Sequence, residues 1–292
     1  MSKIKLITDT TSDIPPALAK EFGIEIKNIP IAIDGTGYLE GVDFSNEEFY
    51  ERLLAAKEIP ATSRINCAEY LESFTRAAAE GYTDLICVTI NGKGSGTLES
   101  AHLAREQFLR DEPVLAAGMK ITIIDSKSYS LGYGYPVMEA AKMIAAGEAP
   151  GKIIAYIQDW ADSAEIFLAC YTLDFAKKSG RISSAAAFVG ELLGLRPIIH
   201  MVDGGNNVLE KVRGDKNVVP RVCALCQKAI AAGGEYIIVR GMLDEPAEEL
   251  SALLEEKLGY PPKGVYTIGA SVSINAGPRI IAVVVRGQKR PQ

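Results

Sequence analysis

The chain has 292 residues, 48% hydrophobic and 23% charged, as expected of a globular protein with a substantial core. Its 31 basic and 37 acidic residues give a net charge of -6, and no long basic stripe is present, so we expect no nucleic-acid partner. No apolar run reaches the about 18 residues of a membrane helix, and no signal region follows Met1. Five scattered cysteines do not indicate a disulfide framework. We therefore expect a cytoplasmic protein without stable membrane insertion.

Short apolar strands alternate with amphipathic helices in the first half of the chain. In chain order, the pattern predicts a strand at Ile4–Thr8, a helix from Pro15 to Gly23, an extended segment at Ile24–Ile33, helices beginning at Ser45 and Asn66, a strand at Leu85–Ile90, a helix after Thr97, a strand at Ile121–Ile124 and a helix at Tyr135–Ala146. Ser45 and Asn66 are each followed three residues later by glutamate, which indicates a capping box. This alternation predicts an α/β domain with a parallel sheet and flanking helices.

The segment 146–151 is the best linker candidate, and it divides the chain into domains 1–150 and 151–292. Beyond it we expect a helix at Lys152–Asp162, a strand at Ile166–Tyr171, a hairpin of Ile198–Val202 with Val208–Val212, a strand at Tyr236–Arg240, a helix at Glu245–Leu258 and two extended runs around Gly277-Pro278. Hairpins mixed with helices predict a C-terminal α+β domain with a mixed sheet.

A glycine-rich turn, Asn91–Thr97, connects a predicted strand to a predicted helix. Its backbone N–H groups and the Ser95 and Thr97 hydroxyls would lie at a helix N-terminus, where an anion is favoured. The orders GxxxxGK[ST] and GxGxxG are absent, so a small anionic head group is favoured over a nucleotide. A tight turn with a serine or threonine N-cap explains the same residues equally well.

Other hydroxyl-rich turns stand at comparable positions: Asp9–Asp13, Thr62-Ser63 and Asp125-Ser126. In an open parallel sheet, loops at the carboxyl ends of the strands converge on one crevice. Neutral donors around one anion, without an obvious catalytic base, are typical of a binding pocket. We therefore assign no catalytic residue.

The histidines and the paired cysteines carry no predicted chemistry. His102 lies on a predicted helix and His200 in an apolar strand, and we interpret both as structural. Cys223 and Cys226 form a single CxxC within a helical pattern, without the second pair of ligands that a zinc site needs. We therefore expect no metal site.

A cationic stretch, Lys177–Ser184, is either a solvated face or an anchor for loops or an anion at the domain boundary. A solvated face is the usual case, but Arg181 lies between Gly180 and a predicted helix cap, a geometry suited to the anchoring role. The helix predicted next, Ala185–Leu193, is rich in small and apolar residues. It is interpreted either as plain core or as the lining of an apolar tunnel.

Five motifs occur in order along nearly the whole chain: Asp9-Thr10-Thr11-Ser12-Asp13, Ala61-Thr62-Ser63, Ser95-Gly96-Thr97-Leu98-Glu99-Ser100-Ala101, Ser179-Gly180-Arg181-Ile182-Ser183 and Gly277-Pro278. Together they resemble those of the DegV family, bacterial two-domain proteins that bind a fatty acid. The resemblance implies a DegV-like fold, with an N-terminal parallel sheet, flanking helices and a C-terminal α+β domain.

The resemblance also implies a function and a set of site residues. A long-chain fatty acid would lie between the two domains, its carboxylate held by the hydroxyls of Thr62 and Ser95 with the Gly96 backbone nearby. Further ligand-binding positions are Ser63, Thr97, Asn275 and Gly277, and Arg181 is assigned to a loop or partner contact. Family members that act as the binding subunit of fatty acid kinase use no cofactor and present the acid to a separate kinase, whose acyl-phosphate product feeds phospholipid synthesis.

Three features of the sequence depart from the family pattern. Asn275 stands where the family commonly has histidine, Arg279 replaces a glycine, and Arg64-Ile65-Asn66 replaces a polar, proline-containing continuation. Because an amide donor lacks charge, and a charged donor binds a carboxylate about twice as strongly, we expect a weakened or retuned head-group site. Two alternatives use the same crevice: an enzyme acting on a small phosphorylated substrate, and a regulatory module that senses a lipid or an anion.

Overall fold

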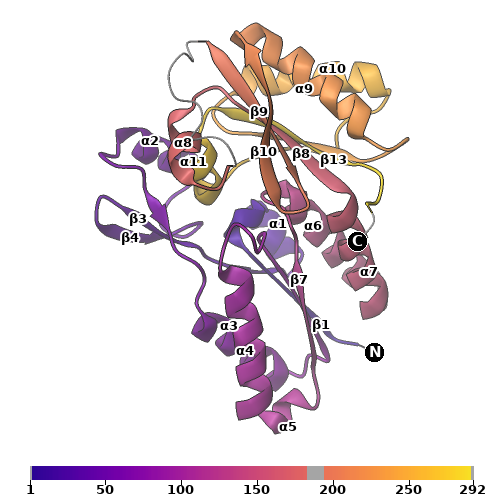
Figure 1. Cartoon of the computed structure of the whole chain (residues 1–292). Helices are drawn as coiled ribbons and strands as arrows, with labels where there is room; N and C mark the ends of the chain where they lie inside the picture. Colours follow the sequence, from indigo (N-terminus) through magenta and orange to yellow (C-terminus); the bar gives the residue numbers. More distant parts are fainter. Residues whose placement is uncertain (1, 183–193, 291–292) are drawn as a thin grey trace. The chain divides into compact units, whose positions relative to one another are not determined.

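The computed structural model describes residues 2–182 and 194–290, and the chain forms two compact units (Figure 1). The first comprises Met1–Ala32, Gly37–Asp43 and Thr62–Ala161, and the second comprises Ile33–Thr36, Phe44–Ala61 and Asp162–Gln292. This division differs from the predicted single boundary after residue 150.

Two buried aromatic residues explain the difference in boundaries. Trp160, in α7 (Pro150–Ser163), is 1% exposed, and its indole nitrogen donates to the Gly132 carbonyl at 2.9 Å within the first unit. The predicted linker is therefore only the turn between α6 (Leu131–Ala145) and α7. In the second unit, the hydroxyl of Tyr50, in α2 (Asn46–Ala55), donates to the Ile268 carbonyl, which ties α2 to distant sequence.

The first unit is built on a parallel four-stranded sheet in the order β2-β1-β6-β7, which confirms the predicted sheet type. Its strands are β1 (Ile4–Asp9), β2 (Glu25–Lys27), β6 (Asp84–Thr89) and β7 (Lys120–Asp125). The helices are η1 (Thr10–Ser12), α1 (Pro16–Glu21), α3 (Cys67–Ala79), α4 (Thr97–Asp111), α5 (Pro113–Ala116), α6 and most of α7. Four consecutive β6 side chains, from Leu85 to Val88, are fully buried, as an inner parallel strand requires.

A smaller sheet of three strands has the order β4-β3-β5. Its strands are β3 (Pro30–Ile33), β4 (Thr36–Leu39) and β5 (Ala61–Thr62). Both predicted capping boxes are confirmed: Ser45 with Glu48 begins α2, and Asn66 with Glu69 begins α3.

The second unit contains a mixed six-stranded sheet in the order β10-β9-β8-β13-β11-β12, in which only β11 and β12 pair in parallel. Its strands are β8 (Ala164–Cys170), β9 (Leu195–Val202), β10 (Gly205–Arg213), β11 (Tyr236–Arg240), β12 (Val265–Thr267) and β13 (Ile280–Arg286). Its helices are α2, α8 (Asp174–Ser179), η3 (Asp215–Asn217), α9 (Val218–Ala229), α10 (Asp244–Leu258) and α11 (Ala270–Ala276). The predicted α+β domain with a mixed sheet is confirmed.

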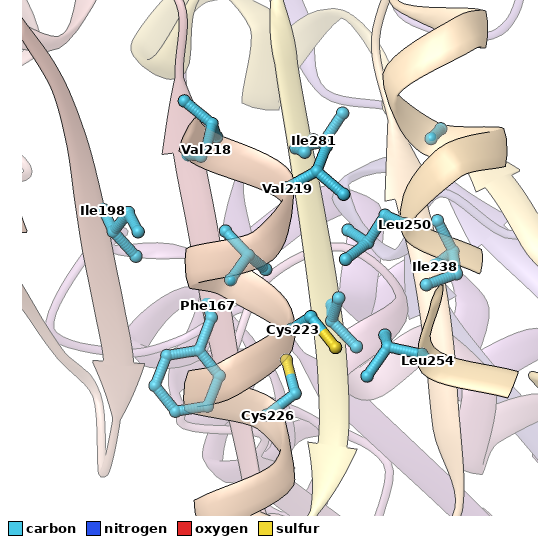
Figure 2. Close-up of a cluster of buried hydrophobic side chains, with 14 of the residues drawn as sticks. Phe167, Ile198, Val218, Val219, Cys223, Cys226, Ile238, Leu250, Leu254 and Ile281 are labelled. Carbon is cyan, nitrogen blue, oxygen red and sulfur yellow. The ribbon is translucent and has the colours of Figure 1, made fainter. Parts of the chain in front are cut away.

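Helices α9 and α10 pack on one face of this sheet (Figure 2). Alternate strand residues such as Ile281 and Val283 point to this face because side chains alternate along a strand. Cys223 and Cys226 lie among them, and both are nearly fully buried. Burial raises the pKa of both thiols, so this CxxC packs in the core as neutral thiols.

The extended run predicted before Gly277-Pro278 is wrong, because Ala270–Ala276 forms helix α11. The helix ends at Gly277, whose φ of 84° suits glycine and whose N–H donates to the Ser273 carbonyl at 2.8 Å. The run predicted after this turn is confirmed as β13. No helix in the described part of the chain has both the length and the apolar character of a membrane span.

Candidate ligand-binding site

Three turns meet at the carboxyl edge of the first unit's sheet, as expected for an open parallel sheet. The N–H of Asn91, after β6, donates to the carbonyl of Ser128, after β7, at 3.1 Å. The N–H of Ser130 donates in turn to the carbonyl of Thr11, after β1, at 3.0 Å. Backbone hydrogen bonds therefore hold the turns after β1, β6 and β7 together.

Asp9, the last residue of β1, fastens these turns from inside the unit. Its Oδ2 accepts the N–H of Ile90 at 2.9 Å, and its Oδ1 accepts the N–H of Thr11 at 3.1 Å and the hydroxyl of Tyr133 at 2.6 Å. Burial raises the pKa of the Asp9 carboxyl to about 6, although the hydrogen bonds from Tyr133 and Ile90 act to lower it. The carboxyl links β1, β6 and α6.

The glycine-rich turn places Ser95 and Thr97 in different environments. The hydroxyl of Ser95 donates to Oγ1 of Thr97 at 3.0 Å, and its Oγ also accepts the Thr97 N–H at 3.3 Å. Thr97 is fully buried, whereas Ser95 is partly exposed. Ser95 is therefore the more accessible of the two hydroxyls, and the buried Thr97 hydroxyl accepts its hydrogen bond.

A cavity of about 590 Å³ opens against this turn. It is lined by Gly92, Lys93, Gly94, Ser95, Gly96, Leu98, Glu99 and His102. Of the predicted site residues in the first unit, Ser95 and Gly96 line this cavity, whereas Thr62, Ser63 and Thr97 are not among its lining residues.

His102 was predicted to be structural, and the structure places it in the cavity wall. Leu98 and His102 are four residues apart on α4 and so share one helix face, a signal that sequence reasoning did not use. Burial, and next the charge of Arg105, lower the pKa of His102, so its imidazole is neutral at pH 7.

Two glycines of the turn allow other side chains to approach closely. A Cβ at Gly94 would lie 2.3 Å from the hydroxyl oxygen of Tyr129. A Cβ at Gly96 would lie 2.9 Å from both Cδ and Nη1 of Arg64. Arg64 follows Thr62-Ser63 in sequence, so the long side chain of the next residue along this segment reaches the glycine-rich turn.

The predicted residues of the second unit gather at the end of α11. Asn275 donates from Nδ2 to the Ser271 carbonyl at 2.8 Å, within its own helix. A Cβ at Gly277 would lie 2.9 Å from the ring of Phe175 and 3.1 Å from Oγ1 of Thr172, so glycine permits this close packing. The amide of Asn275 retains one donor hydrogen, and the predicted contact with a ligand depends on it.

Arg181 is exposed and is held by local contacts. Its guanidinium donates to the carbonyl of Ser179 at 2.9 Å, and its own carbonyl accepts from Nδ2 of Asn206 at 3.0 Å. The helix predicted at Ala185–Leu193 lies outside the described residues.

His200 occupies a structural position in the second unit, as predicted. Its Nε2 lies 2.6 Å from Oε2 of Glu165, and its ring stacks on Phe167 with the ring centres 4.8 Å apart. Among residues 2–182 and 194–290, no group of three or more histidine, cysteine or acidic side chains is placed to hold a metal ion.

Fold and site together define a two-unit α/β protein with an open cavity, lined by the glycine-rich turn and the start of α4, at the carboxyl edge of its parallel sheet. The chain belongs to the DegV family: the family model described as "Uncharacterised protein, DegV family" matches residues 3–288. It is 28% identical to a DegV domain-containing protein of Clostridium perfringens over 282 residues, which cover 96% of this chain and 97% of that protein.

Two solved structures are similar along their whole length. A fatty acid binding DegV family protein from Streptococcus agalactiae is 28% identical, with a TM-score of 0.85 over 99% of this chain and 100% of that one. A stearic acid-binding protein from Eubacterium ventriosum is 25% identical, with a TM-score of 0.87 over 98% of each chain. These similarities confirm the predicted DegV-like fold.

Proposed function

We propose that this chain binds a long-chain fatty acid and that Ser95, with the Gly96 backbone, holds its carboxylate, assisted by Thr62. The observation that carries the proposal is the cavity at the glycine-rich turn, where Ser95 lies beside the N-terminus of α4. The solved proteins of Streptococcus agalactiae and Eubacterium ventriosum, which bind fatty acids, support the choice of ligand. The acyl chain's position between the two units stays a prediction, as do the roles of Ser63, Thr97, Asn275 and Gly277.

In this proposal the chain is not an enzyme by itself. It presents the carboxylate, in the cytoplasm, to a separate kinase whose acyl-phosphate product enters phospholipid synthesis, as the family resemblance implies. The state of Asp9 supports a binding role: this carboxyl is fully buried and accepts three hydrogen bonds, so it holds the turns and does not face the cavity as a base.

The acyl chain supplies most of the affinity in this account. Burying one methylene contributes about 0.8 kcal/mol, so about 15 methylenes contribute on the order of 12 kcal/mol before the costs of binding. A hydrogen bond to a charged group contributes about 1.5–3 kcal/mol. The head-group residues therefore select the carboxylate more than they determine the overall affinity.

The double variant Thr62→Ala, Ser95→Ala removes two hydrogen bonds to the carboxylate and is expected to bind hexadecanoic acid about a hundredfold more weakly than the wild type, while affinity for hexadecanol stays within about twofold. The alcohol keeps the acyl chain and lacks the charge that the two hydroxyls recognise. Titration of delipidated protein with each compound measures both affinities.

The exposed residue Thr36, on β4, provides a matched hydroxyl control, and Thr36→Ala is expected to leave both affinities unchanged. If the double variant loses the alcohol as completely as the acid, the two hydroxyls do not act through the carboxylate, and the assigned head-group site is wrong.

A second candidate function uses the same cavity for a small phosphorylated ligand. The presence of Lys93 and His102 among the lining residues favours it, since the Lys93 ammonium attracts a phosphate and the neutral His102 imidazole has one N–H to donate. This alternative predicts that inorganic phosphate saturates the cavity, with perturbed His102 resonances in an NMR titration. The fatty-acid proposal predicts no saturation by phosphate.

A further inference from the structure

Arg64 extends from a backbone that is fixed on both sides. The N–H of Ser63 donates to the carbonyl of Pro30 at 2.9 Å, and the side chain of Ile65 is fully buried. Asn66 then begins α3, where its Oδ1 accepts the N–H of Glu69 at 3.0 Å. The position of the Arg64 backbone is therefore set by its neighbours, whereas its exposed side chain can exchange one anionic partner for another.

Arg64 is not itself among the lining residues of the cavity, but its guanidinium contacts two of them, Gly96 and Glu99. Its Nη1 is 2.9 Å from the point where a Cβ of Gly96 would stand, so it lies against the backbone that begins α4. The same nitrogen donates to Oε2 of Glu99 at 3.1 Å, and Glu99 lines the cavity. The Arg64 side chain is 55% exposed and that of Glu99 is 69% exposed.

This ion pair shows that a carboxylate reaches Arg64 beside Ser95 and Gly96. An ion pair between two exposed side chains is weak and exchanges readily with competing ions. A guanidinium presents five N–H donors in a planar fork that matches the two oxygens of a carboxylate. Glu99 accepts a hydrogen bond from Nη1 only, and among the described residues no other acceptor is bonded to the Arg64 guanidinium.

We propose that Arg64 is a further carboxylate-binding residue of this site, which exchanges Glu99 for the head group of the bound acid. The inference rests on the proposed fatty-acid function and adds a residue that gives the site its preference for a charged head group. Arg64 would supply a cation in the first unit, where Ser95 and the Gly96 backbone offer only neutral donors. Glu99 then competes with the ligand, because its carboxylate pairs with the Arg64 guanidinium when no ligand is bound.

Binding of hexadecanoic acid and hexadecanol to delipidated full-length variants tests this role. Arg64→Gln is expected to weaken acid binding about tenfold and to change alcohol binding less than twofold, because only the acid carries a charge for the guanidinium. Arg64→Lys, which keeps the charge and loses the fork, is expected to fall between Arg64→Gln and the wild type. Glu99→Gln is expected to tighten acid binding two- to threefold, because the competing carboxylate is removed.

An exposed ion pair at the C-terminal end of α4, Arg110 with Asp111, provides the matched controls. Neither residue lines the cavity, so Arg110→Gln and Asp111→Asn are expected to keep the wild-type ratio of acid to alcohol affinity. If the wild-type protein binds the acid and Arg64→Gln has the same ratio of acid to alcohol affinity as the wild type, the proposed role of Arg64 is wrong, while the proposed fatty-acid function stands. Wild-type protein that binds neither compound overturns the proposed function, and the role of Arg64 with it.

Discussion

Replacing Gly134 with alanine is expected to destabilise the first unit by about 3 kcal/mol or more. Gly134 lies in the first half of α6, and a Cβ there would stand 2.1 Å from the carbonyl oxygen of Ser12 and 3.2 Å from a side-chain carbon of Ile14. Because the obstructing oxygen belongs to the backbone, the clash is relieved only if α6 and the turn after β1 move apart. Urea denaturation, followed by circular dichroism, measures the loss.

Gly151, in the first turn of α7, is the matched control for Gly134. A Cβ at Gly151 has nothing within 4 Å, so Gly151→Ala is expected to leave stability unchanged or to raise it by about 0.5–1 kcal/mol. A Gly134→Ala protein that unfolds at the same urea concentration as the wild type would contradict the packing of α6 against the turn at Ser12.

Removing the Asp9 carboxyl is the second change with a large expected effect. Asp9→Ala leaves the N–H groups of Thr11 and Ile90 and the hydroxyl of Tyr133 buried without their acceptor. Each buried unsatisfied donor costs about 1–3 kcal/mol. The variant also no longer buries a charged carboxylate, which offsets part of this cost, so we expect the free energy of unfolding to fall by about 3 kcal/mol at pH 7. The free energy of unfolding, from urea titrations, measures it.

The effect of Asp9→Ala is also expected to depend on pH. The folded-state pKa of Asp9 is about 6 and the ordinary value is 3.8, so the folded state binds the proton more tightly than the unfolded state. The part of the Asp9 contribution that depends on proton binding is therefore fully present below pH 3.8 and is lost as pH rises through 6, which leaves the hydrogen-bond contribution at pH 7. Within this window the difference between wild type and variant should grow by up to about 1.4 kcal/mol for each unit that the pH is lowered.

The exposed residue Asp111, which pairs with Arg110 at the surface, supplies the control for Asp9. Asp111→Ala is expected to leave the free energy of unfolding close to that of the wild type at each pH from 4 to 7, because its ion pair is exposed to solvent. A difference between wild type and Asp9→Ala that is small, or flat across pH 4 to 7, would contradict the buried hydrogen-bonded carboxyl.

Elements with strong local signals could be predicted from the sequence. The apolar run of β6 indicates an inner parallel strand because burial on both faces requires it, and the structure confirms this. The capping boxes at Ser45 and Asn66 fix two helix starts through contacts three residues apart. The helix α11 was missed because its residues are stabilised by tertiary packing against α8 and by the Gly277 turn, which the local pattern does not show.

Domain boundaries and the cavity wall depend on contacts between distant residues. Trp160 places α7 with the first unit through the Gly132 carbonyl, and Tyr50 places α2 with the second through the Ile268 carbonyl. Neither pairing has a local sequence signal. Ser95 and Gly96 could be predicted from the glycine-rich turn, whereas Arg64 reaches the turn only because a glycine at 96 leaves room for its side chain.

The central claim is that this chain carries a long-chain fatty acid. Denaturing extraction of protein purified from bacterial cells, followed by lipid mass spectrometry, tests it most directly. The account predicts a stoichiometric amount of long-chain fatty acid in the extract of the wild-type protein. An extract without fatty acid, from protein that also fails to bind hexadecanoic acid when it is supplied, would contradict the account.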